Sequence, residues 1–83
     1  TQLTLKDRTG SSRIELTVGS STGPALHLKN AAGTTMVVID LKEEHPRLVM
    51  HDKTGKPRMV LVVDEKPALE FTNASGALLA RMP

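Results

Sequence analysis

Apolar and polar residues alternate in eight short runs along this chain. The runs form four consecutive pairs, and a turn signal lies between the two runs of each pair. The signal is Asx-x-x-Gly, which starts at Asp7, Asn30, Asp52 and Asn73, at spacings of 23, 22 and 21 residues. Asp or Asn at the first turn position binds the backbone two residues on, and Gly at the fourth adopts positive φ. The signal predicts a type I turn closed by a G1 bulge, a common hairpin connection. The predicted turn-forming residues are Asp7, Gly10, Asn30, Gly33, Asp52, Gly55, Asn73 and Gly76.

The residues on both sides of each turn alternate with the period of two that is typical of a β-strand. Before each turn, apolar residues stand four and two places ahead of the Asx, as in Leu48 and Met50. After it, they fall four, six and eight places past the glycine, as in Met59, Leu61 and Val63. We therefore expect strands near residues 2–6, 12–18, 25–29, 35–41, 47–51, 58–63, 68–72 and 77–82.

The hairpins form four tandem repeats, at approximately 1–23, 24–45, 46–66 and 67–83. A proline begins the second, third and fourth copies, and the connection before it shortens from five residues (19–23) to four (42–45) to three (64–66). Single hairpins are marginally stable, so the copies must combine to bury their apolar side. We predict one all-β domain, built as a meander, a solenoid or a closed barrel, either alone or completed by other chains.

Composition excludes several classes of protein. The 83 residues contain no cysteine, and 11 basic residues against 9 acidic ones give a net charge of +2 without a basic stripe, which argues against nucleic-acid binding. The longest apolar run, Met59 to Val63, is too short for membrane insertion. Phe71, predicted to point inward, is the only aromatic residue, so stacking platforms for sugars or single strands are lacking. A chain that begins at Thr1 is expected to be processed or a piece of a longer one.

Candidate chemistry is sparse. The Asx residues resemble calcium ligands in spacing, but two of the four are Asn, and carboxylates do not recur around them. His27 and His51 are predicted on the outward side of strands, and His45 in a connection. Two of these histidines could meet across neighbouring strands and bind zinc, yet no further ligand completes such a set. We expect no catalytic residue, metal or cofactor, and we keep a metal-assisted hydrolase on the histidines as a remote alternative.

The outward side of the strands loses its polar character in the middle of the chain. The first copy has ordinary polar residues there, and the fourth recovers them. The second and third copies instead place Met36, Val38, Val49, Val60 and Val62 outward. An apolar patch with polar flanks indicates a covered surface. We predict contact with another chain at these residues, the alternative being a second small core inside a curled sheet.

The copies resemble a known kind of repeat. Leu-x-Leu-x-Asx-x-x-Gly followed by an alternating strand, seen in residues 48–59 (LVMHDKTGKPRM), is similar to tandem β-hairpin repeats of uncharacterised bacterial proteins. The resemblance covers essentially the whole chain and implies no activity. A weaker similarity is to trimeric β-structured segments of phage tail fibres, which also use short strands and Asx/Gly turns. The sequence does not specify the compartment, and an extracellular, cell-surface or virion setting is the one we favour.

We therefore expect a non-catalytic structural or assembly module, a self-associating fibre, stalk or scaffold segment. The expected partner is another copy, in a homo-oligomer or filament, with a trimer as the closed form. The alternative is a ligand-binding or adhesin-type module that uses the proline-tipped connections. The polar sequences of these connections share no common set of recognition residues, which favours the first interpretation.

Overall fold

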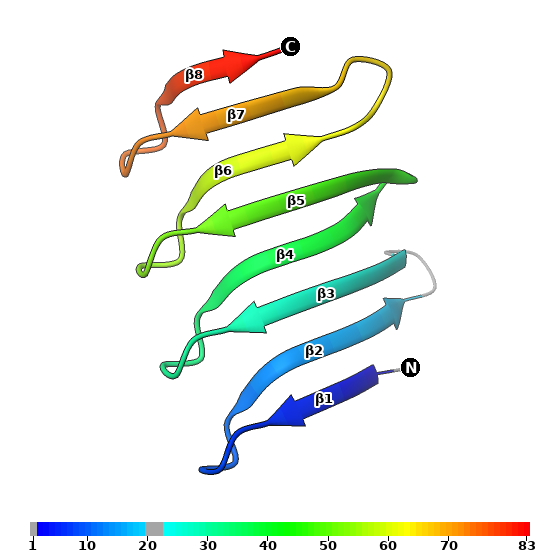
Figure 1. Cartoon of the computed structure of the whole chain (residues 1–83), viewed down its shortest axis with the longest axis vertical. Helices are drawn as coiled ribbons and strands as arrows, with labels where there is room; N and C mark the ends of the chain where they lie inside the picture. Colours follow the sequence, from blue (N-terminus) through cyan, green and yellow to red (C-terminus); the bar gives the residue numbers. More distant parts are fainter. Residues whose placement is uncertain (1, 20–22) are drawn as a thin grey trace.

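The structure is a computed structural model that describes residues 2–19 and 23–83, and it is all-β. Eight antiparallel strands in chain order make one sheet (Figure 1). The strands are β1 (Gln2–Lys6), β2 (Ser12–Gly19), β3 (Gly23–Lys29), β4 (Thr35–Lys42), β5 (His45–His51), β6 (Pro57–Val62), β7 (Ala68–Thr72) and β8 (Leu78–Met82). The predicted meander of four hairpins is confirmed.

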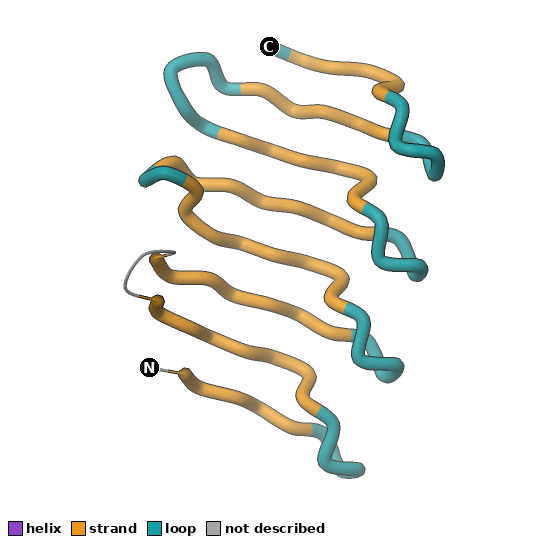
Figure 2. Tube along the Cα trace, turned by 180° about the vertical axis from the view of Figure 1, so that it is seen from behind, coloured by secondary structure: helices purple, strands orange, loops and turns teal. Residues whose placement is uncertain are grey.

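The sheet stays open and forms a single layer. Each strand pairs only with its neighbours in sequence, and β1 does not pair with β8, so the predicted alternative of a closed barrel is wrong. The principal extents are 40 × 29 × 14 Å, and the 40 Å length is close to the ~34 Å that seven spacings of about 4.8 Å require. Figure 2, the view from behind, shows the same uncovered layer. Within the described residues no second layer lies on either side.

The four Asx-x-x-Gly turns lie along one edge of the sheet, which we call the turn edge (Figure 1). In the first, the Gly10 amide donates to the carbonyl of Asp7 at 3.0 Å, and the Asp7 amide donates to the carbonyl of Ser11 at 2.9 Å. The same pair of bonds recurs in the other three turns. Gly10, Gly33, Gly55 and Gly76 have φ of 87°, 86°, 89° and 91°, the left-handed geometry that a G1 bulge requires.

Each hairpin also contains a second irregularity that the alternation did not predict. The register of β1 with β2 shifts between Leu5, which pairs with Ile14, and Lys6, which pairs with Ser12. Arg13 is therefore an extra residue, three places after the turn glycine. The same shift occurs in the other three hairpins, where the extra residues are Met36, Arg58 and Leu79. Bulges of this kind increase the local twist of a strand.

The opposite edge, which we call the loop edge, carries the start of β1, the end of β8 and the described connections between hairpins (Figure 1). The predicted four-residue connection at 42–45 is wrong, because pairing continues to Lys42 opposite His45 and leaves a two-residue turn. Its two residues, Glu43 and Glu44, have φ of 52° and 68°, as in a type I′ turn. Residues 20–22 of the predicted first connection lie outside the described residues.

Pro46 lies inside β5, opposite Leu41, and does not precede the strand as predicted. Its carbonyl accepts the Val63 amide at 3.1 Å, so its backbone polar groups point toward β6. The ladder between β5 and β6 ends at Arg47 and Val62. Pro46 therefore stands opposite Val63, one residue beyond this ladder, and its missing N–H removes only the reciprocal bond to Val63 at the end of the paired region.

The apolar side chains do not form an interior. Among the described residues only Val49, 7% exposed, is buried, and no large side chain is fully enclosed. The copies were expected to combine to bury their apolar side, alone or with other chains, and the single chain by itself does not bury it. A domain normally buries its apolar side between two packed layers, and this sheet has one.

Candidate interaction face

The register places the alternating apolar residues of the predicted strands in two unbroken rows that cross all eight strands. One row is Leu3, Leu16, Leu26, Ile39, Leu48, Leu61, Leu69 and Met82, and the other is Leu5, Ile14, Leu28, Val37, Met50, Met59, Phe71 and Ala80. Because directly paired residues point to the same side of a sheet, the rows share one face. We call this the apolar face. No polar residue interrupts either row.

The apolar face is open to solvent in the single chain. Among the described residues, eleven large apolar side chains are exposed, and register or alternation places nine of them on this face, including Leu3 at 54%, Val18 at 59% and Ile39 at 47%. Toward the loop edge, Leu16, Leu26, Ile39 and neighbouring residues line an open hollow of about 490 Å³. Monomeric soluble proteins rarely leave so much contiguous apolar surface exposed. The face therefore has the character of an interaction surface.

The other side of the sheet, which we call the charged face, is built differently. Its two rows are Thr4, Glu15, His27, Val38, Val49, Val60, Glu70 and Arg81, and Thr17, Ala25, Asp40, Arg47, Val62 and Ala68. Three cross-strand ion pairs lie here, namely Lys29–Glu15 at 3.1 Å, Arg47–Asp40 at 2.6 Å and Arg81–Glu70 at 3.3 Å. The Arg47–Asp40 pair is bidentate, and its hydrogen bonds raise the pKa of Arg47. These charges suit contact with water.

The predicted interface patch lies at the centre of the charged face. Val38, Val49 and Val60 are in direct register on β4, β5 and β6, and Val62 stands opposite Arg47. Val49 is the buried residue, and Val38, Val60 and Val62 are half-buried. Met36 is the half-buried extra residue of the second hairpin's bulge. The long side chains two residues either side of Val49 on β5, Arg47 and His51, share its face and flank the cluster.

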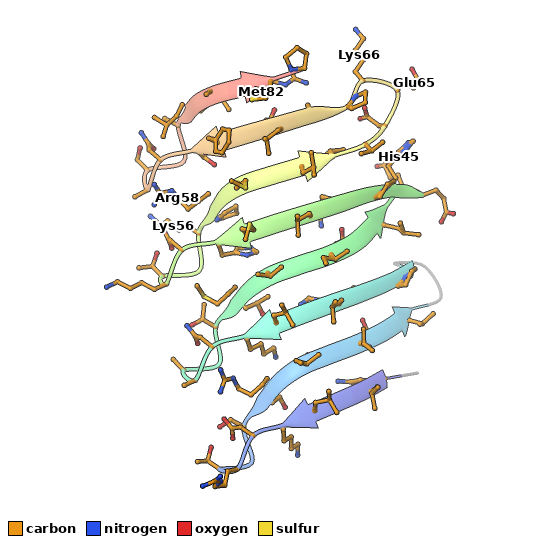
Figure 3. All side chains as sticks on the ribbon, in the orientation of Figure 1. His45, Lys56, Arg58, Glu65, Lys66 and Met82 are labelled. Atoms are coloured by element: carbon orange, nitrogen blue, oxygen red, sulfur yellow. The ribbon has the colours of Figure 1, made fainter. Side chains whose placement is uncertain are left out.

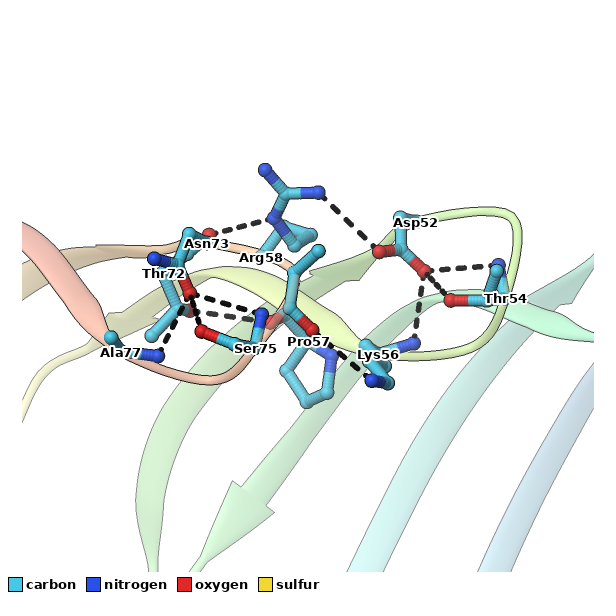
Figure 4. Close-up of polar contacts among 10 residues, drawn as sticks. Asp52, Thr54, Lys56, Pro57, Arg58, Thr72, Asn73, Ser75 and Ala77 are labelled. Carbon is cyan, nitrogen blue, oxygen red and sulfur yellow. Dashed lines mark hydrogen bonds and ion pairs between the residues drawn. The ribbon is translucent and has the colours of Figure 1, made fainter.

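The Asx side chains are occupied within their own turns. In every turn one side-chain oxygen accepts backbone amides two and four residues on, as Asp52 does from Thr54 at 2.9 Å and Lys56 at 3.1 Å (Figure 4). The first and third turns gain a further bond from a threonine hydroxyl, which for Thr54 is 2.6 Å. This hydroxyl, the two amides and the Arg58 guanidinium lower the pKa of Asp52 to about 2. Asp7 has an equivalent set of partners, and its pKa is also lowered to about 2.

Two arginines connect consecutive hairpins at the turn edge. Arg58 pairs through Nη1 with Asp52 of its own turn at 3.4 Å and donates through Nε to the carbonyl of Thr72 in the next hairpin at 2.7 Å (Figure 4). Arg13 repeats this arrangement with Asp7 at 3.3 Å and the carbonyl of Lys29 at 2.9 Å. Both arginines occupy the extra position of the bulge. The bulge thus directs a cation at the neighbouring hairpin.

The residue at the Asx position and the residue at the bulge position change together between hairpins. Asp occurs with Arg in the first and third hairpins, whereas Asn occurs with Met36 in the second and with Leu79 in the fourth. In the second hairpin the Asn30 amide contacts the Met36 sulfur at 3.5 Å. A carboxylate is therefore present only where a guanidinium can pair with it. Sequence reasoning treated Asp and Asn as equivalent turn formers and missed this correlation, which a column-by-column comparison of the four copies would have found.

The histidines do not come together. His27 lies on β3, whereas His45 and His51 are the two ends of β5, and β4 separates the two strands. The ring of His51 is 3.3 Å from the carbonyl of Met36. In the part of the chain that the structure describes, no three His, Asp or Glu side chains are arranged to hold a metal ion. That part also contains no helix that is long and apolar enough to cross a membrane.

Comparison with known proteins finds no protein-family model, no curated protein and no solved structure that matches this chain.

Proposed function

We propose that this chain is a non-catalytic structural module that self-associates by covering its apolar face with a second copy of the same chain, as a segment of a fibre, stalk or scaffold. The observation that carries the proposal is the pair of unbroken apolar rows on a sheet with no second layer. The tandem hairpin pattern, which resembles bacterial repeat proteins and fibre segments, supports the same conclusion.

The size of the apolar face fits a stable contact between two copies. Extents of 40 Å and 29 Å correspond to a face of roughly 1,200 Å², whereas a stable interface needs about 800 Å² per partner. Two sheets packed face to face lie about 10 Å apart and interdigitate their side chains. A second copy would therefore supply the missing layer and convert the exposed rows into a sandwich core.

The charged face is the weaker candidate for this contact. Its valine cluster already contains the most buried residue of the described chain, and the ion pairs around the cluster would have to be desolvated in an interface. Desolvating an ion pair often costs as much as its attraction returns. The side-chain hydrogen bonds of this face and of the turns serve strand pairing and turn geometry, which supports a structural role for the polar residues.

Light scattering after size exclusion tests the proposal. At micromolar concentration we expect at least twice the 8.9 kDa chain mass, and a trimer would give three times that mass. Thermal unfolding should also shift upward as the protein concentration rises, because association stabilises the folded state. A folded 8.9 kDa species with an unfolding temperature independent of concentration would refute the proposal and favour the ligand-binding alternative.

A matched pair of variants locates the contact. Ile39→Glu with Leu61→Lys alters the apolar face on β4 and β6, and Val38→Glu with Val60→Lys makes the same charge changes one residue earlier, on the charged face. We expect only the first pair to abolish association. If the second pair alone abolishes it, the contact lies at the valine cluster. Far-UV circular dichroism distinguishes a dissociated sheet from an unfolded chain.

A further inference from the structure

The two edges of the sheet carry opposite charge. The turns with their flanking residues, 6–13, 29–36, 51–58 and 72–79, contain seven basic and two acidic residues, a net charge of +5. The loop-edge segments 42–45 and 63–67 contain four acidic and two basic residues, a net charge of −2. Since the chain as a whole carries only +2, its charge is separated along the strand direction rather than spread evenly.

The excess charge at each edge is exposed. At the turn edge Asp7 and Asp52 are paired with Arg13 and Arg58, and Lys29 is paired with Glu15, which leaves the exposed cations Lys6, Arg8, Lys53 and Lys56. At the loop edge the exposed carboxylates are Glu43, Glu44, Asp64 and Glu65. Figure 3 shows the labelled Lys56 and Arg58 at the turn end of the sheet and His45, Glu65 and Lys66 at the other end. The 29 Å extent separates the two edges by well over the Debye length of about 8 Å at physiological ionic strength.

We propose that the second copy lies face to face with the first so that the basic turn edge of each chain covers the acidic loop edge of the other. This inference rests on the proposed function, and it adds the orientation of the partner. A two-fold axis that runs along the order of the strands produces the arrangement and places each strand over its own counterpart. The interface is then isologous, and it contains two contacts in which a basic turn edge faces an acidic loop edge.

The apolar face does not distinguish between two orientations of the second copy, whereas the charges at the edges do. Turning the second copy end for end keeps the apolar rows in contact but stacks turn edge on turn edge and loop edge on loop edge. At a sheet separation of about 10 Å, like-charged edges would then lie within roughly one Debye length of each other at 0.1 M salt. Opposite edges attract over the same distance, and like charges that face each other disfavour the wrong partner geometry.

Site-specific cross-linking tests the orientation directly, because the chain has no cysteine of its own. Thr54→Cys marks the turn edge and Glu65→Cys marks the loop edge. With a bismaleimide whose reach is well below the 29 Å extent, an equimolar mixture of the two variants should give a cross-linked dimer, and neither variant alone should do so. Cross-linking of Thr54→Cys to itself, but not to Glu65→Cys, would overturn the inference.

Charge reversal gives an independent readout. We expect Arg8→Glu/Lys53→Glu/Lys56→Glu to weaken its own dimer by roughly tenfold at low salt. The reversed loop edge, Glu43→Lys/Glu44→Lys/Glu65→Lys, should have a similar effect, and mixing the two variants should restore a dimer that contains one of each. Wild-type association should weaken as salt rises. Association that strengthens with salt, or reversed variants that associate as well as the wild type, would overturn the orientation.

These outcomes separate the inference from the proposed function. If wild-type protein associates and depends on Ile39 and Leu61, but the turn edges cross-link to each other, the apolar interface stands and the orientation is wrong. If wild-type protein is a folded monomer, both the proposed function and the orientation are overturned.

Discussion

The turn between β4 and β5 offers a sharp test of how this sheet is held together. Glu43 and Glu44 have φ of 52° and 68°, a region that L-residues other than Asn, Asp and Gly adopt at a cost of roughly 1–2 kcal/mol each. Asn-Gly is the sequence that a type I′ turn prefers. We therefore expect Glu43→Asn with Glu44→Gly to stabilise the protein.

The size of the gain follows from two opposing effects. Relief of the left-handed strain at both positions returns about 2–3 kcal/mol, since Asn keeps part of the cost and Gly almost none. The added glycine loses about 0.5–1 kcal/mol through the greater freedom of the unfolded chain. The net expectation is a gain of about 1–2 kcal/mol in the free energy of unfolding, and each kcal/mol raises the Tm by about 4–8 °C in a chain of this size.

A matched control separates backbone strain from the removal of charge. Asp64→Asn with Glu65→Gly introduces the same two residues and removes the same two charges in the next connection. Neither Asp64 nor Glu65 has a positive φ, so glycine gains nothing there and should cost up to about 1 kcal/mol. Both variants should be unfolded by urea at one protein concentration, because association also contributes to stability. If the two variants change stability equally, or if the turn variant is no more stable than wild type, the strain argument is refuted.

Three further predictions concern the turn edge. Gly55→Val should lower the free energy of unfolding in urea by at least about 1 kcal/mol, because valine resists the positive φ of this position. A Cβ at Gly55 would meet only Thr34, at an ordinary 3.5 Å, so an unchanged stability would contradict this explanation. Asp7 and Asp52 have a pKa of about 2 in the folded protein, below the value near 3.9 in the unfolded chain, so they stabilise the folded state above about pH 4 and lose this effect as the pH falls toward 2. Between pH 4 and pH 2 the double variant Asp7→Asn/Asp52→Asn should therefore lose less stability than the wild type. Arg58→Met should be more destabilising alone than together with Asp52→Asn, which a double-mutant cycle measures, because the double change reproduces the uncharged pair of the second hairpin.

Local pattern was sufficient to predict the strands and the turns. Period-two alternation identified all eight strands, and most of the predicted strand ends lie within one residue of the observed ones. Asx-x-x-Gly located each hairpin turn because its geometry is made by bonds among five consecutive residues, as between Asp7 and Ser11. The tight turn at Glu43 and Glu44 was missed because nothing in that pair favours positive φ; cross-strand pairing from Leu41 to Pro46 imposes it.

What the sequence alone determined is therefore the set of strands, their turns and the two kinds of face, since each depends on residues close together in the chain. Only the tertiary structure decided that the sheet remains an open single layer, because closure depends on accumulated twist across eight strands and leaves no trace in a two-residue period. It also decided which face is exposed. The valines predicted outward surround Val49 beside Arg47 and the ion pairs, whereas the alternating leucines of the opposite face have no layer to pack against. Burial depends on what lies above a face, and an alternating pattern specifies only that the two faces differ.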